Sequence, residues 1–116
     1  MAAVLVKRSD KRVVEPQIES VIIDKNGCHD VHISDLSRKG LRFGSNEQYK
    51  IGEKLKFKMQ STDDKADLSI IIKAKVINDY GSKADGMHEY GVTFIRFFYW
   101  YEMNCIHSYV YSRGKE

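Results

Sequence analysis

Two groups of residues in the first 40 positions have side chains suited to binding an anion. Arg8 and Arg12 stand four residues apart, and Asp35, Ser37 and Gly40 form a D-x-S-x-x-G pattern. An arginine offers a planar fork of donors that matches phosphate oxygens. An ionised aspartate accepts hydrogen bonds, and a serine hydroxyl both donates and accepts. Together these residue types predict a site for an anionic ligand that also carries hydrogen-bond donors.

The excess positive charge of the chain lies around the two arginines. The chain has 19 Lys and Arg and 16 Asp and Glu, for a formal net charge of +3. Four bases and one acid between residues 7 and 12 account for that +3, so the rest of the chain is balanced. This favours a local anion site, to which Lys7 and Lys11 would contribute, over a generally basic surface that coats nucleic acid. On charge alone, a solvated basic tail that aids solubility is favoured over the anion site.

Length and composition exclude several classes of protein. At 116 residues and 42% hydrophobic content, the chain predicts a single domain over 1–116. No apolar run approaches the roughly 20 residues that span a bilayer, and the first six residues are too short for a secretory signal. Cys28 and Cys105 do not make a disulfide scaffold. We therefore expect a soluble, cytoplasmic protein.

Hydrophobic periodicity predicts several short strands and then one helix. Residues 1–16 show no regular period, end at Pro16, and are expected to form a flexible arm. Alternating patterns predict strands over 18–23, 28–35, 40–43, 53–59, 68–80 and 88–96. Asn26-Gly27 predicts a hairpin turn between the first two strands. An apolar stripe at helical spacing then predicts a helix over 97–112. The stripe consists of Tyr99, Met103, Ile106 and Val110. This order favours a small β-barrel over 17–96 with the helix packed at its side or mouth.

The ordered set of arginine pair, D-x-S-x-x-G pattern, Gly91-Val92-Thr93-Phe94 strand and terminal helix resembles the PilZ domain family. The resemblance covers most of the chain, from about Lys7 to Tyr111. It implies an all-β fold with a C-terminal helix, built as a small six-stranded antiparallel, split β-barrel. It also implies that the chain binds the bacterial second messenger cyclic di-GMP.

The resemblance further assigns the ligand contacts. It implies that the ligand is held by these residues: Arg8, Arg12, Asp35, Ser37 and Gly40. Many family members have more arginines around the pair, whereas this arm uses Lys7 and Lys11 and carries Asp10. The ligand is a cyclic dianion with two guanines, and an arginine fork matches guanine O6 and N7 as well as phosphate. Asp35 suits the guanine N1–H and N2–H donors.

Two details of the D-x-S-x-x-G pattern stay open at this stage. Asp35 and Ser37 share strand parity with Val31 and Ile33, which have the character of core residues. Either a bulge precedes Asp35, or the pair sits at the barrel rim. Gly40 is expected to provide a positive φ or a close approach of the ligand to the backbone. Three nearby bases could extend the anion site, but they are expected to be solvated: Arg38, Lys39 and Arg42.

The leading hypothesis is a non-enzymatic regulatory module whose arm closes over cyclic di-GMP and so changes the surface shown to a protein partner. An adaptor of similar fold that works without the ligand is the alternative, supported by the aromatic run from Phe97 to Tyr101. A nucleic-acid-binding barrel is disfavoured by the balanced charge of the remaining chain. A zinc site at Cys28, His29 and His32 is disfavoured because the two histidines point to opposite faces of a strand. No cofactor and no catalytic constellation are predicted.

Overall fold

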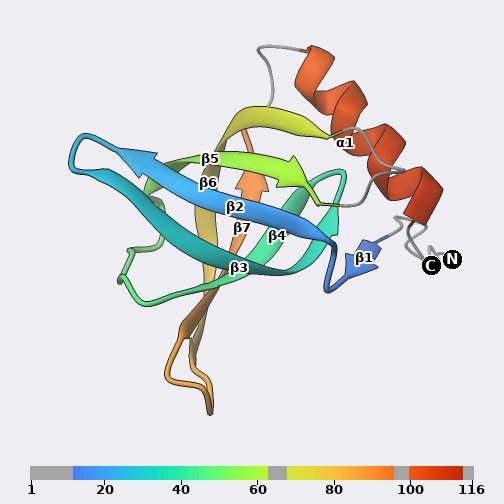
Figure 1. Cartoon of the computed structure of the whole chain (residues 1–116). Coiled ribbons are helices and arrows are strands. Elements are labelled where there is room, and N and C mark those ends of the chain that lie inside the picture. The colour runs from blue at the N-terminus through green and yellow to red at the C-terminus, as the bar shows by residue number, and fades with distance from the viewer. Residues whose placement is uncertain (1–11, 63–67, 96–99, 114–116) are drawn as a thin grey trace, which may run out of the picture.

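The computed structural model describes residues 12–62, 68–95 and 100–113. In this part of the chain, strands precede one helix (Figure 1). The elements are β1 (Arg12–Val14), β2 (Ile18–Asp24), β3 (Gly27–Ser37), β4 (Gly40–Ser45), β5 (Lys54–Ser61), β6 (Ser69–Ser82), β7 (His88–Phe94) and α1 (Trp100–Arg113).

The sheet closes into a barrel. The strand order is β1-β3-β2-β5-β6-β7-β4, and an additional pairing of β3 with β4 closes the run from β3 to β4 into a ring. Every pairing is antiparallel. β2 to β7 therefore form a closed six-stranded barrel, and β1 is added at one edge. The predicted six-stranded antiparallel barrel with a C-terminal helix is confirmed.

Alternation along the strands builds the core. The alternating apolar residues of two predicted strands are all buried: Leu55, Phe57 and Met59 on β5, and Ile70, Ile72, Ala74 and Val76 on β6. Phe43 lies at the centre, with ring centroids 5.2 Å from Phe57 and 5.5 Å from Tyr90. Asp24 pairs with Gly27 across the predicted Asn-Gly turn, where Gly27 has φ of 126°. Hydrophobic patterning and turn chemistry thus account for this hairpin and these strands.

The end of the predicted arm is a strand. Residues 12–14 were placed in the flexible arm over 1–16, and for these three residues that prediction was wrong. β1 pairs with β3 through Arg12 opposite Ser37 and Val14 opposite Asp35, and Val13 is buried. A three-residue strand with one inward side chain is too short to produce a readable period. Residues 1–11 lie outside the described part of the chain.

The C-terminal helix covers one end of the barrel. α1 buries Ile106, Tyr109 and Val110 and packs against β1, β3 and β6. Figure 1 shows β1 lying beside α1, at the end of β3. Two of the four residues of the predicted helical stripe are therefore confirmed as inward, Ile106 and Val110. Tyr99 and the Met103 side chain fall outside the description.

Gly40 allows β4 and β7 to meet. A Cβ atom at Gly40 would overlap the carbonyl oxygen of Val92 and lie 3.1 Å from the Cα of Thr93. The adjacent backbone is fixed by a 2.8 Å hydrogen bond from the Phe94 N–H to the Lys39 carbonyl. Gly40 is not among the residues with positive φ. Of the two alternatives given for Gly40, positive φ is therefore excluded, and β7 approaches the Gly40 backbone closely.

We predict that Gly40→Ala destabilises the barrel while Gly44→Ala, on the same strand, does not. A Cβ at Gly44 would make only ordinary contacts, the nearest at 3.5 Å to Met87 Cβ. The added methyl at position 40 must push the β7 backbone, which costs about 1–3 kcal/mol or more. Urea unfolding of both variants measures this difference. Equal unfolding free energies for the two variants would contradict it.

Candidate functional site

A groove of about 310 Å³ brings the described motif residues together. It is lined by Arg12, Asp35, Ser37, Lys39, Gly40, Leu41, Arg42, Ile77, Asn78, Tyr80, Gly91, Val92 and Thr93. Of the seven predicted site residues, four lie here: Arg12, Asp35, Ser37 and Gly40. The other three lie outside the described residues: Lys7, Arg8 and Lys11. The volume falls at the lower end of the range for small-ligand pockets.

A β-bulge in β3 aims Asp35 and Ser37 into the groove. The pairing of β3 with β4 shifts register between Ile33 and Asp35. Ile33 and Leu36 are both buried although they are three residues apart. The extra residue, Ser34, therefore turns the next two polar side chains to the outer face. Of the two alternatives that the sequence left open, the bulge is the one observed.

Arg12 and Asp35 form an ion pair across β1 and β3. Arg12 Nη1 lies 3.3 Å from Asp35 Oδ2, with side chains 54% and 18% exposed. Burial of Val13 turns the flanking Arg12 outward, because side chains alternate along β1. An ion pair this exposed contributes only about 0–1 kcal/mol to stability. A ligand that satisfies both partners can therefore separate them at little cost.

Ser37 closes the turn between β3 and β4. Its hydroxyl donates to the Gly40 carbonyl at 3.3 Å and accepts from the Lys39 N–H at 3.2 Å. Both bonds are local, as expected of a serine in a turn. Ser37 also lines the groove. Rotation about its Cβ–Oγ bond lets the hydroxyl donate to a bound anion in place of the Gly40 carbonyl.

The far side of the groove is built by Arg42 and Tyr80. The Arg42 guanidinium carbon lies 3.9 Å from the centre of the Tyr80 ring. Arg42 Nε also lies 3.3 Å from Glu89 Oε1. A guanidinium held between an aromatic face and a carboxylate has few remaining freedoms, so it presents its free donors in a fixed direction. The expectation that Arg42 is simply solvated was wrong.

Glu89 is the charged centre of this cluster. Its side chain is 11% exposed, and besides Arg42 it contacts Lys83 Nζ at 3.1 Å and accepts from Ser34 Oγ at 2.9 Å. Burial raises the pKa of Glu89, but hydrogen bonds from Lys83 and Ser34 and the positive charges of Arg42 and Lys83 outweigh that effect. The net result is a pKa below the ordinary value. Glu89 is therefore held ionised and fixes Arg42 in place.

Sequence reasoning missed Tyr80 and Glu89, which lie far along the chain from the D-x-S-x-x-G pattern. Tyr80 lies near the end of β6 and Glu89 near the start of β7. The hairpin that these two strands form projects from the barrel (Figure 1). The pairing of β6 with β7 shifts register between Val76 and Asn78, and again between Asp79 and Gly81. These shifts break the alternation that would have shown which way Tyr80 faces.

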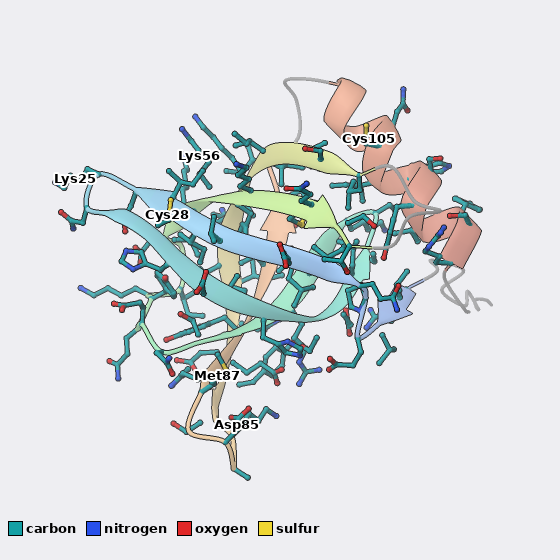
Figure 2. All side chains as sticks on the ribbon, in the orientation of Figure 1. Lys25, Cys28, Lys56, Asp85, Met87 and Cys105 are labelled. Carbon is teal, nitrogen blue, oxygen red and sulfur yellow. The ribbon has the colours of Figure 1, made fainter. Side chains whose placement is uncertain are left out.

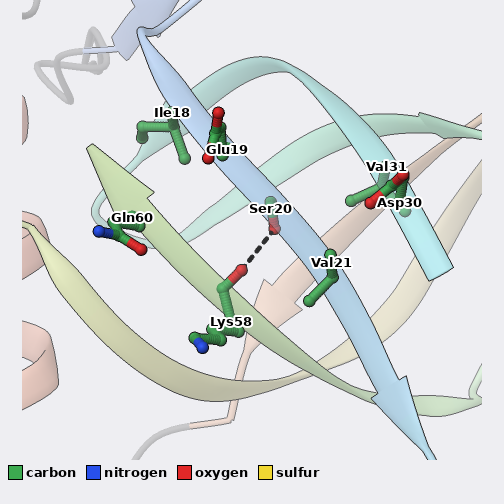
Figure 3. A pocket seen from close by; sticks show the side chains of 8 residues that line it. All are labelled: Ile18, Glu19, Ser20, Val21, Asp30, Val31, Lys58 and Gln60. Atoms are coloured by element: carbon green, nitrogen blue, oxygen red, sulfur yellow. Dashed lines mark hydrogen bonds between the residues drawn. The ribbon is translucent and has the colours of Figure 1, made fainter. Parts of the chain in front are cut away.

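A second hollow lies on the outer face of β2, β3 and β5 (Figure 3). Its volume is about 580 Å³, and it contains none of the motif residues. Glu19 and Asp30 line it together with Lys58, and the Ser20 hydroxyl donates to the Lys58 carbonyl at 3.0 Å. Acidic side chains outnumber the basic one there, which disfavours an anion. The Arg12 groove is therefore the candidate site for an anionic ligand.

The two histidines of the disfavoured zinc site, His29 and His32, contact different carboxylates. His29 Nε2 lies 3.0 Å from Asp24 Oδ2, whereas His32 Nε2 lies 2.8 Å from Glu15 Oε1. No group of three potential metal ligands occurs within residues 12–62, 68–95 and 100–113. No helix in these ranges is long and apolar enough to cross a bilayer. Residues 97–99 of the aromatic run from Phe97 to Tyr101 lie outside the described part of the chain. The side chains of the other two residues, Trp100 and Tyr101, are also outside it.

Comparison with known proteins points to one family. The family model described as PilZ domain matches residues 6–98, which is most of the chain. The match includes both arginines of the arm, the D-x-S-x-x-G pattern and all of the described barrel strands. No curated protein sequence matches the chain.

Solved structures show the same fold at low sequence identity. The inhibitor of motility MotI/DgrA of Bacillus subtilis is 12% identical with a TM-score of 0.74, covering 94% of this chain and 51% of that one. The PilZ domain of YcgR from Escherichia coli, solved with c-di-GMP, is 11% identical with a TM-score of 0.66, covering 93% and 92%. MrkH of K. pneumonia, in complex with c-di-GMP, is 16% identical with a TM-score of 0.67, covering 90% and 51%. The chain thus spans about half the length of MotI and of MrkH.

We predict that Glu89→Gln destabilises the protein by about 1–3 kcal/mol at neutral pH, because it leaves Arg42 and Lys83 without their shared carboxylate. Because the native pKa is lowered, this stabilisation is fully present above the unfolded-state pKa of about 4.3 and is lost as the pH falls through the native pKa. The gap between wild type and variant therefore narrows on acidification.

Denaturant unfolding between neutral and acid pH measures this gap. Glu19→Gln, at an exposed carboxylate on β2, is the control and should show no such dependence. A gap for Glu89→Gln that stays constant down to low pH would contradict the assignment.

Proposed function

Because the chain belongs to the PilZ domain family, we propose that it binds cyclic di-GMP in the Arg12 groove and acts as a regulatory binding module, not as an enzyme. The observation that carries the proposal is the convergence of Arg12, Asp35, Ser37 and Gly40 on one groove. Support comes from the similar folds of YcgR and MrkH, which were solved with c-di-GMP. A second messenger acts inside the cell, so the proposal includes a cytoplasmic location.

The groove offers the groups that this ligand requires. Cyclic di-GMP is a dianion with two guanines, each with acceptors at O6 and N7 and donors at N1 and N2. The Arg12 fork is assigned to guanine O6 and N7 or to a phosphate, and the Asp35 carboxylate to the guanine N1–H and N2–H donors. Arg8 is assigned the second fork. Lys7, Lys11 and the groove residue Lys39 add positive charge toward the phosphates.

Binding is proposed to exchange an internal contact for ligand contacts. Without ligand, the Arg12 guanidinium forms an ion pair with Asp35 at 3.3 Å. A guanine presents acceptors on one edge and donors on another, so it replaces the partner of both side chains at once. Because the exposed pair contributes little to stability, almost all of the new hydrogen bonding goes into affinity.

The signal is proposed to leave through β1 and α1. β1 carries Arg12 and packs against α1. A ligand that holds the outer side of β1 also holds Val13, whose side chain is buried on the opposite side. The surface around α1 would then differ between the empty and the bound protein, which is how a domain without enzymatic activity can control a protein partner in motility or surface attachment.

We predict that Arg12→Lys weakens binding of cyclic di-GMP about 5- to 150-fold, because lysine keeps the charge but loses the planar fork. Asp35→Asn should weaken binding to a similar extent, because the amide replaces an acceptor with a donor. Isothermal titration calorimetry measures both effects. Lys25→Gln removes one charge from the tip of the β2–β3 hairpin, at the end of the barrel away from α1 (Figure 2), and is the control, with less than about twofold change expected because salt screens a distant charge.

Ligand selectivity gives the second arm of this experiment. The same titration with GTP and with cyclic di-AMP should give much weaker binding, because adenine lacks the O6 acceptor and GTP is not a macrocycle with two guanines. Affinity for cyclic di-GMP should fall as salt rises. Absence of heat with excess cyclic di-GMP, or equal binding by wild type and Arg12→Lys, would refute the proposed site.

A further inference from the structure

The outer face of β5 and β6 carries a dense group of lysines, here called the lysine face. Its members are Lys54, Lys56 and Lys58 on β5 and Lys73 and Lys75 on β6, all exposed. In the strand register Lys54 stands opposite Lys75, and Lys56 opposite Lys73. Figure 2 labels Lys56 on the side of the barrel away from α1.

This arrangement works against the fold. Like charges directly opposite each other on an antiparallel pair are destabilising. The outward positions of β5 and of β6 up to residue 77 contain no acidic residue to offset them. Among the described ion pairs, none involves a member of the lysine face. Asp30 and Glu19 lie to one side on β3 and β2, where they share the outer-face hollow with Lys58, so the opposed like charges are concentrated at the other four lysines. A surface role outside the monomer accounts for such a concentration of charge.

Aliphatic side chains flank the lysine face on β6 and on β2. Ile71 and Ile77 on β6 are 48% and 46% exposed. Val21 and Ile23 on β2 stand opposite Lys58 and Lys56 and are half-buried. No aromatic residue and no arginine occupies the outward positions of β5 or of β6 up to residue 77. The lysine face therefore combines flexible point charges with isolated apolar side chains.

We propose that the lysine face docks this protein on an anionic lipid bilayer. Clusters of four to eight basic residues are attracted to the negative surface of the cytoplasmic leaflet. Lysine suits such a surface because its long stem lets the ammonium adapt to mobile headgroups, while exposed aliphatic side chains enter the boundary between headgroups and acyl chains. Within residues 12–62, 68–95 and 100–113 the five lysines are exposed, and the helix of this part, α1, packs against β1, β3 and β6.

The composition of the lysine face disfavours the other anionic partners. The centres of protein–protein interfaces are depleted in lysine and enriched in arginine and aromatic residues. Proteins that bind single-stranded nucleic acid stack the bases on aromatic side chains. Neither type of residue is present at the outward positions named above. Since Lys75 pairs with Thr93, which lines the Arg12 groove, the central pair Lys56 and Lys73 gives the cleaner test.

The test is co-sedimentation of the full chain with vesicles of equal parts phosphatidylglycerol and phosphatidylcholine, and with vesicles of phosphatidylcholine alone. Only the anionic vesicles should bind, and binding should fall as salt rises. Each lysine near an anionic surface contributes roughly fivefold to partitioning, so Lys56→Gln/Lys73→Gln should reduce it by at least about tenfold. Lys25→Gln/Lys50→Gln removes the same charge from the hairpin tip and a loop, and should reduce partitioning less than about threefold.

Further variants and probes distinguish the outcomes. Lys56→Arg/Lys73→Arg keeps the charge and should keep binding. The glutamine variant should melt at or above the wild-type temperature, because it removes a pair of opposed like charges. Equal binding to both vesicle types, or an equal loss in the Lys56/Lys73 and Lys25/Lys50 glutamine variants, would overturn the proposal. Loss of duplex DNA binding in Lys56→Gln/Lys73→Gln with vesicle binding unchanged would overturn it in favour of a nucleic acid partner.

Discussion

The bulge in β3 is the constraint on which the candidate site depends. Ile33 and Leu36 must both enter the core, and they are three residues apart. One extra residue between them reverses the parity of the strand, so that Asp35 and Ser37 face outward while the core stays closed. β1 then pairs with this outward-facing end of β3 and places Arg12 beside Asp35. Core packing thus fixes where the polar groups of the groove point.

The parts of the fold that follow from periodicity were predictable from the sequence. Strands, the Asn26-Gly27 turn and the burial of Ile106 and Val110 on α1 follow from alternation, turn chemistry and helical spacing. β1 was not predictable, because three residues carry no period. A register shift breaks the alternation of a strand, so the sequence no longer shows which side chains face outward. Tyr80 and Glu89 lie beyond such shifts. The D-x-S-x-x-G pattern located three residues of the groove, Asp35, Ser37 and Gly40, but Gly40 serves the meeting of β4 and β7.

Charge shows most clearly what a sequence sum conceals. Residues 7–12 carry the whole net charge, and the rest of the chain is balanced. Folding separates that balance into surfaces, since β5 and β6 alternate lysines with buried apolar residues and then pair in register. The outward rows meet as Lys56 opposite Lys73, which only the pairing of two distant segments can reveal. The chain outside residues 7–12, which carries no net charge as a whole, therefore supplies a face with five exposed lysines.

The central claim is that cyclic di-GMP enters the Arg12 groove by replacing the Arg12–Asp35 contact. Two-dimensional nitrogen–proton NMR of the labelled chain during a titration with the ligand tests it most directly. The account predicts that the largest changes fall on the Arg12 side-chain N–H and on the backbone amides of Gly40 and Gly91, which line the groove. Changes concentrated instead around Ser20 and Lys58, in the hollow on the outer face of β2, would contradict it.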